Sequence, residues 1–347
     1  MNLTERIASF SSLGEILRDA LGGKPGRFTS QLEQIIETQH TKNPWFTPDN
    51  VRMAVDAIAN VLTGENLKKW TDSYPQLQDD HKPARVAVIM AGNLPLAGFH
   101  DFLSVLITGN NIISKTSSKD PDLIVFISDI LCNINTEFRK KIEFTESTLS
   151  GFDIVIATGS DNTSRYFEHY FGKHPNIIRK NRNSIAILDG NETKQELEAL
   201  GTDVFSYFGL GCRNVSKIYI PEGYNFARLA ESWSKYSALA NHSKYANNYD
   251  FNKAVFLVNK DKFTDTGFVL LREDHRLSSP LAVLYYEIFS SPDQIKKTTT
   301  ELKNKIQCIT GRKHLPFGTT QSPALWDFAD GTDTIEFLLK KNIAGIL

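Results

Sequence analysis

The chain has 347 residues, enough for one large domain or two of ordinary size, each with its own hydrophobic core. Its 39 basic and 40 acidic residues are well mixed and leave a formal net charge of −1, so no strong field is expected to gather nucleic acid or anionic lipid. The three cysteines form no CxxC pair, and the histidines form no HExxH cluster. Disulfides, structural zinc and metal catalysis are therefore not expected, and a reducing cytoplasm is the expected compartment.

The first 80 or so residues are predicted to be helical. Residues 3–21 carry apolar side chains at helical spacing together with charged ones, which is typical of an amphipathic helix and not of a signal peptide. Another helix is predicted from the Thr47-Pro48 start onward. Because no uncharged run approaches the roughly 18 residues of a membrane span, the protein is expected to be soluble.

From residue 86 onward, short β-branched runs alternate with helical stretches. The first set of predicted strands covers residues 86–90, 111–114, 153–157, 184–188 and 217–220, and the second covers 254–258, 267–271 and 281–286. A polar helix is predicted after the second set. This alternation indicates an α/β fold with mainly parallel strands in two domains.

Polar residues follow three of the predicted strands, where open α/β sheets bind their ligands. Asn93 is most simply a turn former or helix cap, although its amide could donate to an oxyanion. Lys115, followed by Thr116, Ser117 and Ser118, is either a solvated strand end or a holder of ribose or phosphate. The small residues at 159–160, before a predicted helix, would expose backbone N–H groups that favour a phosphate.

Cys212 lies between a glycine-rich turn and an apolar strand, in the segment G-L-G-C-R-N. This segment does not fit GxGxxG, and most cysteines are simply small buried apolar residues. Its two glycines, however, let another group approach the backbone closely, and Arg213 could favour a thiolate. Cys132, on an apolar helix face, and Cys308, in a short apolar strand, are predicted to be structural.

Taken together, these segments resemble the aldehyde dehydrogenase superfamily. The turn A-G-N-L-P-L-A-G with its following lysine strand, the turn T-G-S, the cysteine loop and the segment L-P-F-G at residues 315–318 occur in that family's order. The resemblance implies an aldehyde dehydrogenase-like α/β fold, with Cys212 as nucleophile and Asn93 as oxyanion donor. It also implies that the cofactor-binding residues are Lys115, Ser117, Ser118, Thr158, Gly159, Ser160 and, as the nearest candidate for a glutamate on the nicotinamide ribose, Glu273.

At two positions this chain differs from well-known members of the superfamily, and the differences indicate its reaction and its cofactor. Hydrolytic members of the superfamily have a water-activating glutamate where this chain has Arg179, so an acyl-enzyme is expected to be reduced and not hydrolysed. NAD-using relatives commonly have a glutamate where this chain has Ser118, and a serine can donate to the 2′-phosphate that a carboxylate would repel. NADPH is therefore the expected cofactor.

With N-P-W-F-T at residues 43–47 and the ending P-A-L-W-D-F, the chain looks most like the LuxC-like acyl-CoA reductase family. That resemblance implies reduction of long-chain acyl-CoA or acyl-protein thioesters to aldehydes. It also implies a homo-oligomer and a complex with an acyl-protein synthetase or transferase. The alternatives are a reductase of an acyl phosphate or semialdehyde, an acyl carrier or transferase without a redox step, and a noncatalytic protein of the same fold.

The expected domain organisation follows from the same resemblance. A helical segment at residues 1–80 precedes an NADP-binding domain at 81–188 and a catalytic domain at 189–330. Residues 331–347 form a C-terminal segment that could act as an oligomerisation arm. Asp274, His275 and His314 are polar residues that the resemblance does not place; the two histidines are expected to be structural, with supply of a proton as the alternative.

Overall fold

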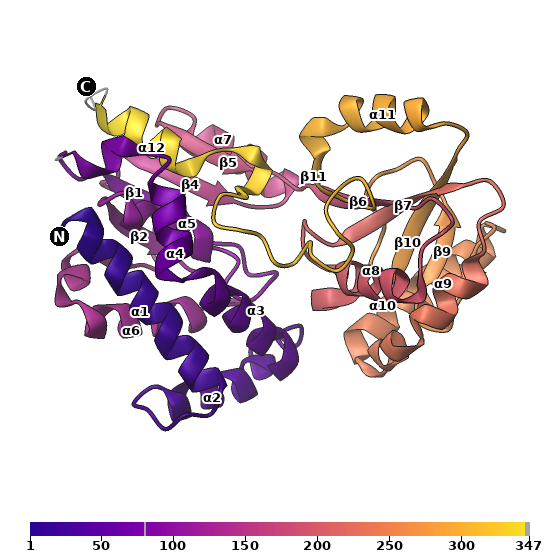
Figure 1. Cartoon of the computed structure of the whole chain (residues 1–347), viewed down its shortest axis with the longest axis horizontal. Coiled ribbons are helices and arrows are strands. Elements are labelled where there is room, and N and C mark those ends of the chain that lie inside the picture. The colour runs from indigo at the N-terminus through magenta and orange to yellow at the C-terminus, as the bar shows by residue number, and fades with distance from the viewer. Residues whose placement is uncertain (80, 344–347) are drawn as a thin grey trace. The chain divides into compact units, whose positions relative to one another are not determined.

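The computed structural model describes residues 1–79 and 81–343 (Figure 1). The chain divides into two compact units: unit 1 comprises Met1–Lys180 and Ala324–Leu347, and unit 2 comprises Asn181–Pro323. The chain therefore passes between the units at 180/181 and 323/324, whereas the boundaries predicted from the sequence are 188/189 and 330/331. Residues 344–347 of the expected C-terminal arm lie outside the described residues.

Unit 1 begins with four helices, of which the sequence predicted the first from its apolar spacing and the third from its Thr47-Pro48 start. They are α1 (Leu3–Leu21), α2 (Thr29–Thr38), α3 (Pro48–Val61) and α4 (Gly64–Thr71), with the 3₁₀ turns η1 (Gln39–Thr41) and η2 (Pro75–Gln78). Asn2 and Glu5 form a reciprocal capping box on α1, and Thr47 caps α3 ahead of a proline at its first turn. These caps satisfy backbone N–H groups that have no partner within the helix.

A five-stranded parallel sheet follows, with strand order β3-β2-β1-β4-β5. Its strands are β1 (Arg85–Ile89), β2 (Asn111–Lys115), β3 (Ile142–Phe144), β4 (Ile154–Thr158) and β5 (Asn176–Arg179). The intervening helices are α5 (Phe99–Ile107), α6 (Leu123–Ile134), η3 (Thr136–Lys140) and α7 (Asp161–Phe171). The strand order reverses direction between β1 and β4, and this switch point is where a doubly wound sheet opens a crevice for a ligand.

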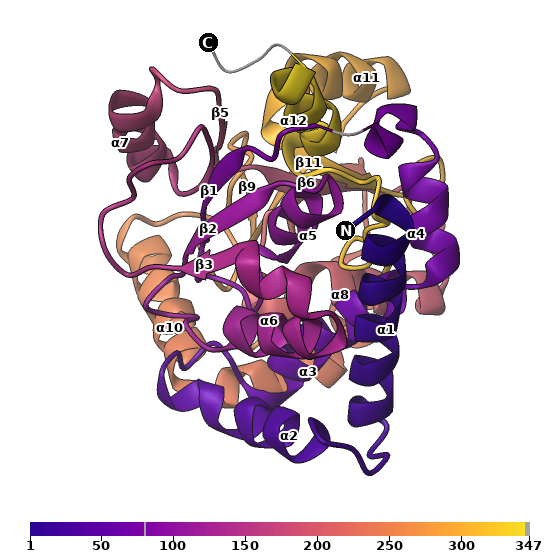
Figure 2. The same ribbon diagram turned by 90° about the vertical axis from the view of Figure 1, so that its left-hand side faces the viewer.

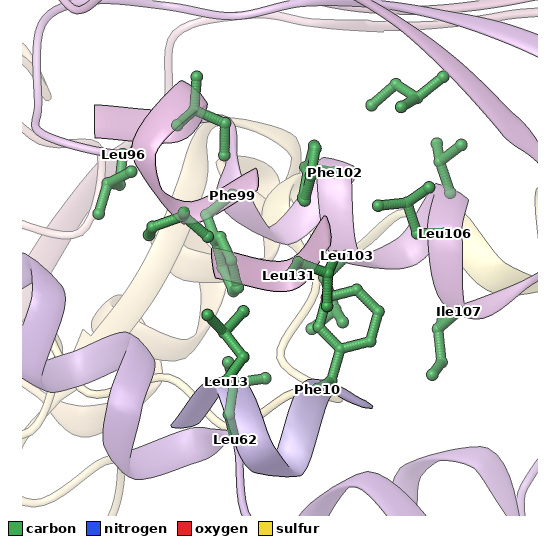
Figure 3. Close-up of a cluster of buried hydrophobic side chains, with 14 of the residues drawn as sticks. Phe10, Leu13, Leu62, Leu96, Phe99, Phe102, Leu103, Leu106, Ile107 and Leu131 are labelled. Atoms are coloured by element: carbon green, nitrogen blue, oxygen red, sulfur yellow. The ribbon is translucent and has the colours of Figure 1, made fainter. Parts of the chain in front are cut away.

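The core of unit 1 lies on one face of this sheet. Figure 2 shows α5, α6 and α1 on one side of the strands and α7 on the other. Figure 3 shows part of the resulting cluster, in which Phe10 of α1 lies near Leu103 of α5 and Leu131 of α6, and Leu13 of α1 lies near Leu62. The opposite face is smaller and is formed by alanine and valine side chains under the phenylalanines of α7.

Unit 2 contains a six-stranded sheet with the order β11-β6-β7-β10-β9-β8, parallel except for the short β8 (Thr264–Asp265). The other strands are β6 (Asn183–Ile187), β7 (Val215–Pro221), β9 (Leu270–Glu273), β10 (Val283–Phe289) and β11 (Ile306–Thr310). Its helices are α8 (Lys194–Phe205), η4 (Ser206–Gly209), α9 (Phe226–Ser232), η5 (Ser234–Asn241), α10 (Ser243–Val258), α11 (Pro292–Glu301) and η6 (Lys303–Lys305). One face packs on α8 and α9, and the other packs on α11.

One predicted strand was wrong. Residues 254–258 are the last turns of α10 and not a strand. The run A-V-F-L-V looks β-like by itself, but the buried residues of α10, Tyr245, Tyr249, Asn252 and Phe256, follow the helical period along its whole length. Strands β3 and β5 were missed because three or four residues are too short to show a clear alternation. No helix among the described residues is long and apolar enough to cross a membrane.

Arg179 holds the returning C-terminal segment against unit 1. It ends β5, and its side chain is 4% exposed, with one guanidinium nitrogen 2.7 Å from Asp101 Oδ1 of α5. It also donates to Ala329 O at 2.7 Å, at the start of η7 (Ala329–Gly331), and to Thr334 Oγ1 at 2.9 Å, at the start of α12 (Thr334–Ile343). Helix α12 in turn packs on α5, with Ile335 and Leu338 fully buried.

This ion pair gives a stability prediction. Asp101→Ala removes the nearer carboxylate of the buried Arg179 guanidinium and leaves Asp330 Oδ2 at 3.9 Å, and breaking a buried pair in this way costs about 3–5 kcal/mol of unfolding free energy. Urea unfolding followed by circular dichroism measures the loss. Glu143→Ala is the control, because the Arg85–Glu143 pair is exposed and its removal should cost less than about 1 kcal/mol. Equal losses in the two variants would contradict the interpretation of Arg179 as a buried structural cation.

Candidate active site

Cys212 lies in the turn that leads into β7, and its side chain is exposed. The backbone just before it is strained, since Tyr207, Phe208 and Gly209 have φ values of 52°, 59° and 79°. Left-handed conformations of bulky residues cost on the order of 1–3 kcal/mol each and persist only where the surroundings impose them. Strain of this kind next to an exposed thiol is typical of a functional turn, although the strain alone does not identify the function.

Asn214 imposes much of this conformation. Its side chain is buried, at 2% exposure, and accepts a hydrogen bond from Gly211 N at 2.8 Å. Its amide donates to the carbonyl oxygens of Asp203 and Ser206, at 3.1 and 2.9 Å, which belong to the end of α8 and the start of η4. One side chain therefore ties the segment just before Cys212 to the helix that precedes it.

The Ser184 hydroxyl fixes the Cys212 backbone from the neighbouring strand. It donates to Cys212 O at 3.0 Å and accepts from Cys308 N at 3.1 Å. The second bond lies at an irregularity in the β6–β11 pairing, where the register shifts between Ile306 and Ile309. The thiol-bearing residue thus has a defined backbone while its side chain remains accessible.

The other two cysteines are buried, as predicted: Cys132 in α6 and Cys308 in β11. Burial raises the pKa of the Cys132 thiol, which favours its unreactive neutral form. Arg213, which the sequence analysis associated with a thiolate at Cys212, places a guanidinium nitrogen 3.2 Å from Cys308 Sγ. The structure therefore shows a contact between this cation and the buried thiol of the neighbouring strand.

A charged cluster lies beside the nucleophile strand. Lys217 of β7 is fully buried; its ammonium group pairs with Glu287 of β10 and donates to His275 O at 3.0 Å. The His275 ring itself is exposed, with Nδ1 3.5 Å from Glu287 Oε1. Glu287 was not predicted from the sequence. A lysine within an apolar strand is nevertheless a signal for a nearby carboxylate, because an unpaired buried charge is very costly.

Two further polar residues considered from the sequence are exposed. Glu273 ends β9, which is separated from β7 by β10 in the sheet. His314 follows β11, and partial burial lowers the pKa of its imidazole, so the neutral form is favoured at neutral pH. Neither residue has a contact that assigns it a role in catalysis.

In unit 1, Asn93 lies exposed in the turn between β1 and α5. The residue before it, Gly92, packs so closely against Ser117 that an added Cβ would lie 2.2 Å from the serine Oγ. The structure therefore brings the Asn93 turn into contact with the loop after β2. Two of the loops selected from the sequence as ligand-binding form one surface at the carboxyl edge of the sheet.

The loop after β2 carries the expected cofactor-binding residues. Lys115 ends the strand, and its ammonium group donates to Ser147 O at 3.1 Å. Ser117 accepts from Lys119 N at 3.2 Å, whereas Ser118 is exposed. A lysine and a hydroxyl at a strand end have the donor chemistry that a ribose phosphate requires.

The third loop joins β4 to α7. Thr158 ends the strand, Gly159 follows, and Ser160 caps α7 by accepting from Thr163 N at 3.3 Å. A Cβ at Gly159 would lie 2.9 Å from Phe167 and Thr163, so glycine lets the helix start close to the strand. Because β4 borders β1 at the switch point, the positive end of α7 lies at the crevice of this sheet.

The fold of the chain is aldehyde dehydrogenase-like. Aldehyde dehydrogenase 21 from Physcomitrella patens superposes with a TM-score of 0.66 over 98% of this chain and 84% of its own, at 12% sequence identity. An NADP-dependent enzyme from E. coli superposes with a TM-score of 0.66 over 89% of this chain and 73% of its own, also at 12% identity. At such low identity these similarities establish the fold alone.

The sequence gives a narrower assignment. Residues 31–231 match the family model described as acyl-CoA reductase (LuxC), so the chain belongs to this family. Long-chain acyl-protein thioester reductase 2 of Photobacterium leiognathi is 26% identical over 192 residues, covering 50% of this chain and 40% of that protein. The long-chain acyl-protein thioester reductase of Aliivibrio fischeri is 23% identical over 235 residues, covering 60% and 47%. The matched regions thus span less than half of these relatives.

A buried carboxylate beside these loops gives a pH prediction. Asp120 is 6% exposed and accepts from Leu96 N at 2.8 Å, and burial raises its pKa to about 6. Its ionisation therefore costs folding stability, a penalty that grows as pH rises from about 4 to 6 and is complete above 6. Asp120→Asn should gain up to about 3 kcal/mol relative to the wild type between pH 4 and 7, measured by urea unfolding across pH.

Asp122 is the matched control. Burial acts to raise its pKa, but hydrogen bonds from Lys42 and Gln39 outweigh burial and the pKa is lowered. Asp122→Asn should therefore lose stability relative to the wild type as pH rises through the acidic range, the opposite trend. The same pH trend in both variants would show that the Asp120 carboxyl is not the titrating group.

Proposed function

We propose that this protein reduces a long-chain acyl thioester to the fatty aldehyde with NADPH, through an acyl-enzyme on Cys212. The observation that carries the proposal is an exposed thiol in a strained turn that Asn214 and Ser184 hold, within the region that matches the LuxC family. The names of the two reductases from Photobacterium and Aliivibrio support an acyl thioester as substrate. The acyl donor is the thioester either of coenzyme A or of an acyl-carrying protein.

The first half-reaction forms the acyl-enzyme. The Cys212 thiolate attacks the carbonyl carbon of the thioester, and collapse of the tetrahedral intermediate breaks the bond to the leaving thiol, which takes a proton from solvent. The Asn93 amide and the Cys212 backbone N–H are the proposed donors to the oxyanion. The rigid backbone at Cys212 supports this role, because preorganised donors need not reorient during the reaction.

The second half-reaction reduces the acyl group. When bound, NADPH would supply the hydride that converts the acyl group to the aldehyde. The same two donors would hold the oxyanion again, and the Cys212 sulfur leaves as a thiolate and is ready for another cycle. The residues at the carboxyl edge of the unit 1 sheet fit this cofactor, with Lys115 and Ser118 toward a ribose phosphate and residues 158–160 at the positive end of α7.

Arg179 supports reduction over hydrolysis. Its guanidinium cannot accept a proton, and it pairs with Asp101, so it cannot activate water as a glutamate does. An acyl group on Cys212 would then persist until it is reduced. A homo-oligomer and a complex with an acyl-protein synthetase or transferase are part of the same proposal, on the resemblance to LuxC-like reductases.

The nucleophile assignment is tested by acyl trapping. Incubation with radiolabelled myristoyl-CoA without NADPH should label the wild type and Cys308→Ala but not Cys212→Ala, because Cys308 is buried. Adding NADPH should release the label as aldehyde with NADPH consumption. Equal labelling of the wild type and Cys212→Ala overturns the acyl-enzyme, and release without NADPH consumption favours an acyltransferase.

The oxyanion assignment predicts a slow but active variant. Asn93→Ala should lower kcat by on the order of 10²–10³, because one of two donors is lost, with little change in KM. The check is NADPH oxidation with myristoyl-CoA at saturating substrate. A kcat within twofold of the wild type would remove Asn93 from the mechanism.

Cofactor preference gives a separate test. Ser118→Glu places a carboxylate where the 2′-phosphate of NADPH is proposed to bind, and the repulsion should lower the ratio of kcat/KM for NADPH to that for NADH at least tenfold. Ser118→Ala is the control, since it removes the hydroxyl without adding a charge and should change the ratio less. An unchanged ratio in Ser118→Glu would place the phosphate elsewhere.

A further inference from the structure

Asn43 begins the N-P-W-F-T segment, which has no part in the chemistry proposed above. It lies between η1 and α3 and is 4% exposed. Its side-chain amide donates to Gly92 O at 3.2 Å, and its side-chain oxygen accepts from Trp45 N at 3.2 Å. Both ends of the side chain are therefore in use, one within its own turn and one on a residue 49 positions away.

The distant contact falls on the peptide group that precedes the proposed oxyanion donor. Gly92 O and Asn93 N belong to one planar peptide unit, so a donor on this oxygen fixes the rotation of the plane and with it φ of Asn93. Glycine alone would leave that rotation free. A side chain cannot replace the glycine to restrict it, because its Cβ would meet Ser117 Oγ at 2.2 Å.

The far end of the turn is held independently. Leu96 has a φ of 59°, and its N–H donates to Asp120 Oδ2 at 2.8 Å. Its side chain is buried near Phe99 in the core of unit 1 (Figure 3). At the end that carries Asn93, the bond from Asn43 restrains the peptide from the side of the helical segment.

We propose that Asn43 is a positioning residue that orients the Asn93 amide by holding the Gly92–Asn93 peptide. This inference rests on the proposed function, in which Asn93 donates to the oxyanion. It gives the N-P-W-F-T segment a role in catalysis although the segment itself touches no reacting atom. The helical start of the chain thereby contributes to the active site through one buried hydrogen bond.

Asn43→Asp removes the side-chain donor to Gly92 O with almost no change in the shape of the side chain. The variant keeps an oxygen for Trp45 N but sets a carboxylate oxygen against Gly92 O, and two acceptors repel, so the peptide should turn. We expect kcat to fall by about 10- to 100-fold with KM within threefold, less than the loss for removing the Asn93 donor itself. A threefold rise in KM with unchanged kcat would overturn the proposal.

Asn50→Asp is the matched control. Asn50 is also a buried asparagine, at 8% exposure, and its amide donates to Trp45 O at 3.0 Å, so its side-chain contacts stay within the same segment. The same chemical change should lower the melting temperature but keep kcat within about twofold of the wild type. An equal fall in kcat in both variants would show a general effect of disturbing the segment.

A double-mutant cycle with Asn93→Ala separates positioning from structural support. If Asn43 acts through Asn93, Asn43→Asp should lower kcat by less than threefold once Asn93 is alanine. If the fold-loss of kcat in the double variant equals the product of the two single-variant losses, the inference is overturned while the proposed function stays intact. A wild-type chain that does not reduce acyl thioesters would overturn the proposed function, and the inference with it.

A folding control completes the cycle. Circular dichroism melting identifies any variant that is unfolded at the assay temperature. If Asn43→Asp is unfolded, Asn43→Ala takes its place, because it removes the donor without adding an opposing acceptor. Asn43→Ala is likewise expected to lower kcat by less than threefold once Asn93 is alanine. A double-variant loss of kcat equal to the product of the single losses would again contradict the proposal.

Discussion

The hydrogen bonds between strands β1, β2 and β4 are the constraint on which the rest of unit 1 depends. Because these strands are parallel, each chain segment must return across a face of the sheet before the next strand starts. Their carboxyl ends consequently lie at one edge, and the three loops that carry Asn93, Lys115 and Gly159 are gathered there. The helices are needed to make these returns, and their packing forms the core.

Loops at such an edge have no ladder of their own, so buried polar side chains determine their conformations. In unit 1, the Asn43 amide and the Asp120 carboxylate hold opposite ends of one turn. In unit 2, Asn214 and Ser184 perform the same task around Cys212. Burying the polar groups that make these contacts costs desolvation free energy. In return, the backbone has a defined conformation beside an exposed functional side chain.

Each unit buries a cation that several partners meet. Arg179 is satisfied by Asp101 and by backbone and hydroxyl oxygens of the C-terminal segment. Lys217 is satisfied by Glu287 and a carbonyl oxygen. The hydrogen bonds from Arg179 to Ala329 and Thr334 hold residues after 323 on unit 1, and Arg179 is also the residue that the family resemblance aligns with a hydrolytic base.

The sequence by itself determined the fold class, most of the strands, the two buried cysteines and the family. These follow from alternation, caps and short motifs, which are local properties of the chain. It failed at residues 254–258, where a β-like run continues a helix because burial follows the helical period. Tertiary structure alone decided that Asn43 reaches Gly92, that Arg213 contacts Cys308 and that Glu287 pairs with Lys217. These contacts join residues 49, 95 and 70 positions apart, and no local pattern specifies which distant partner a buried polar group meets.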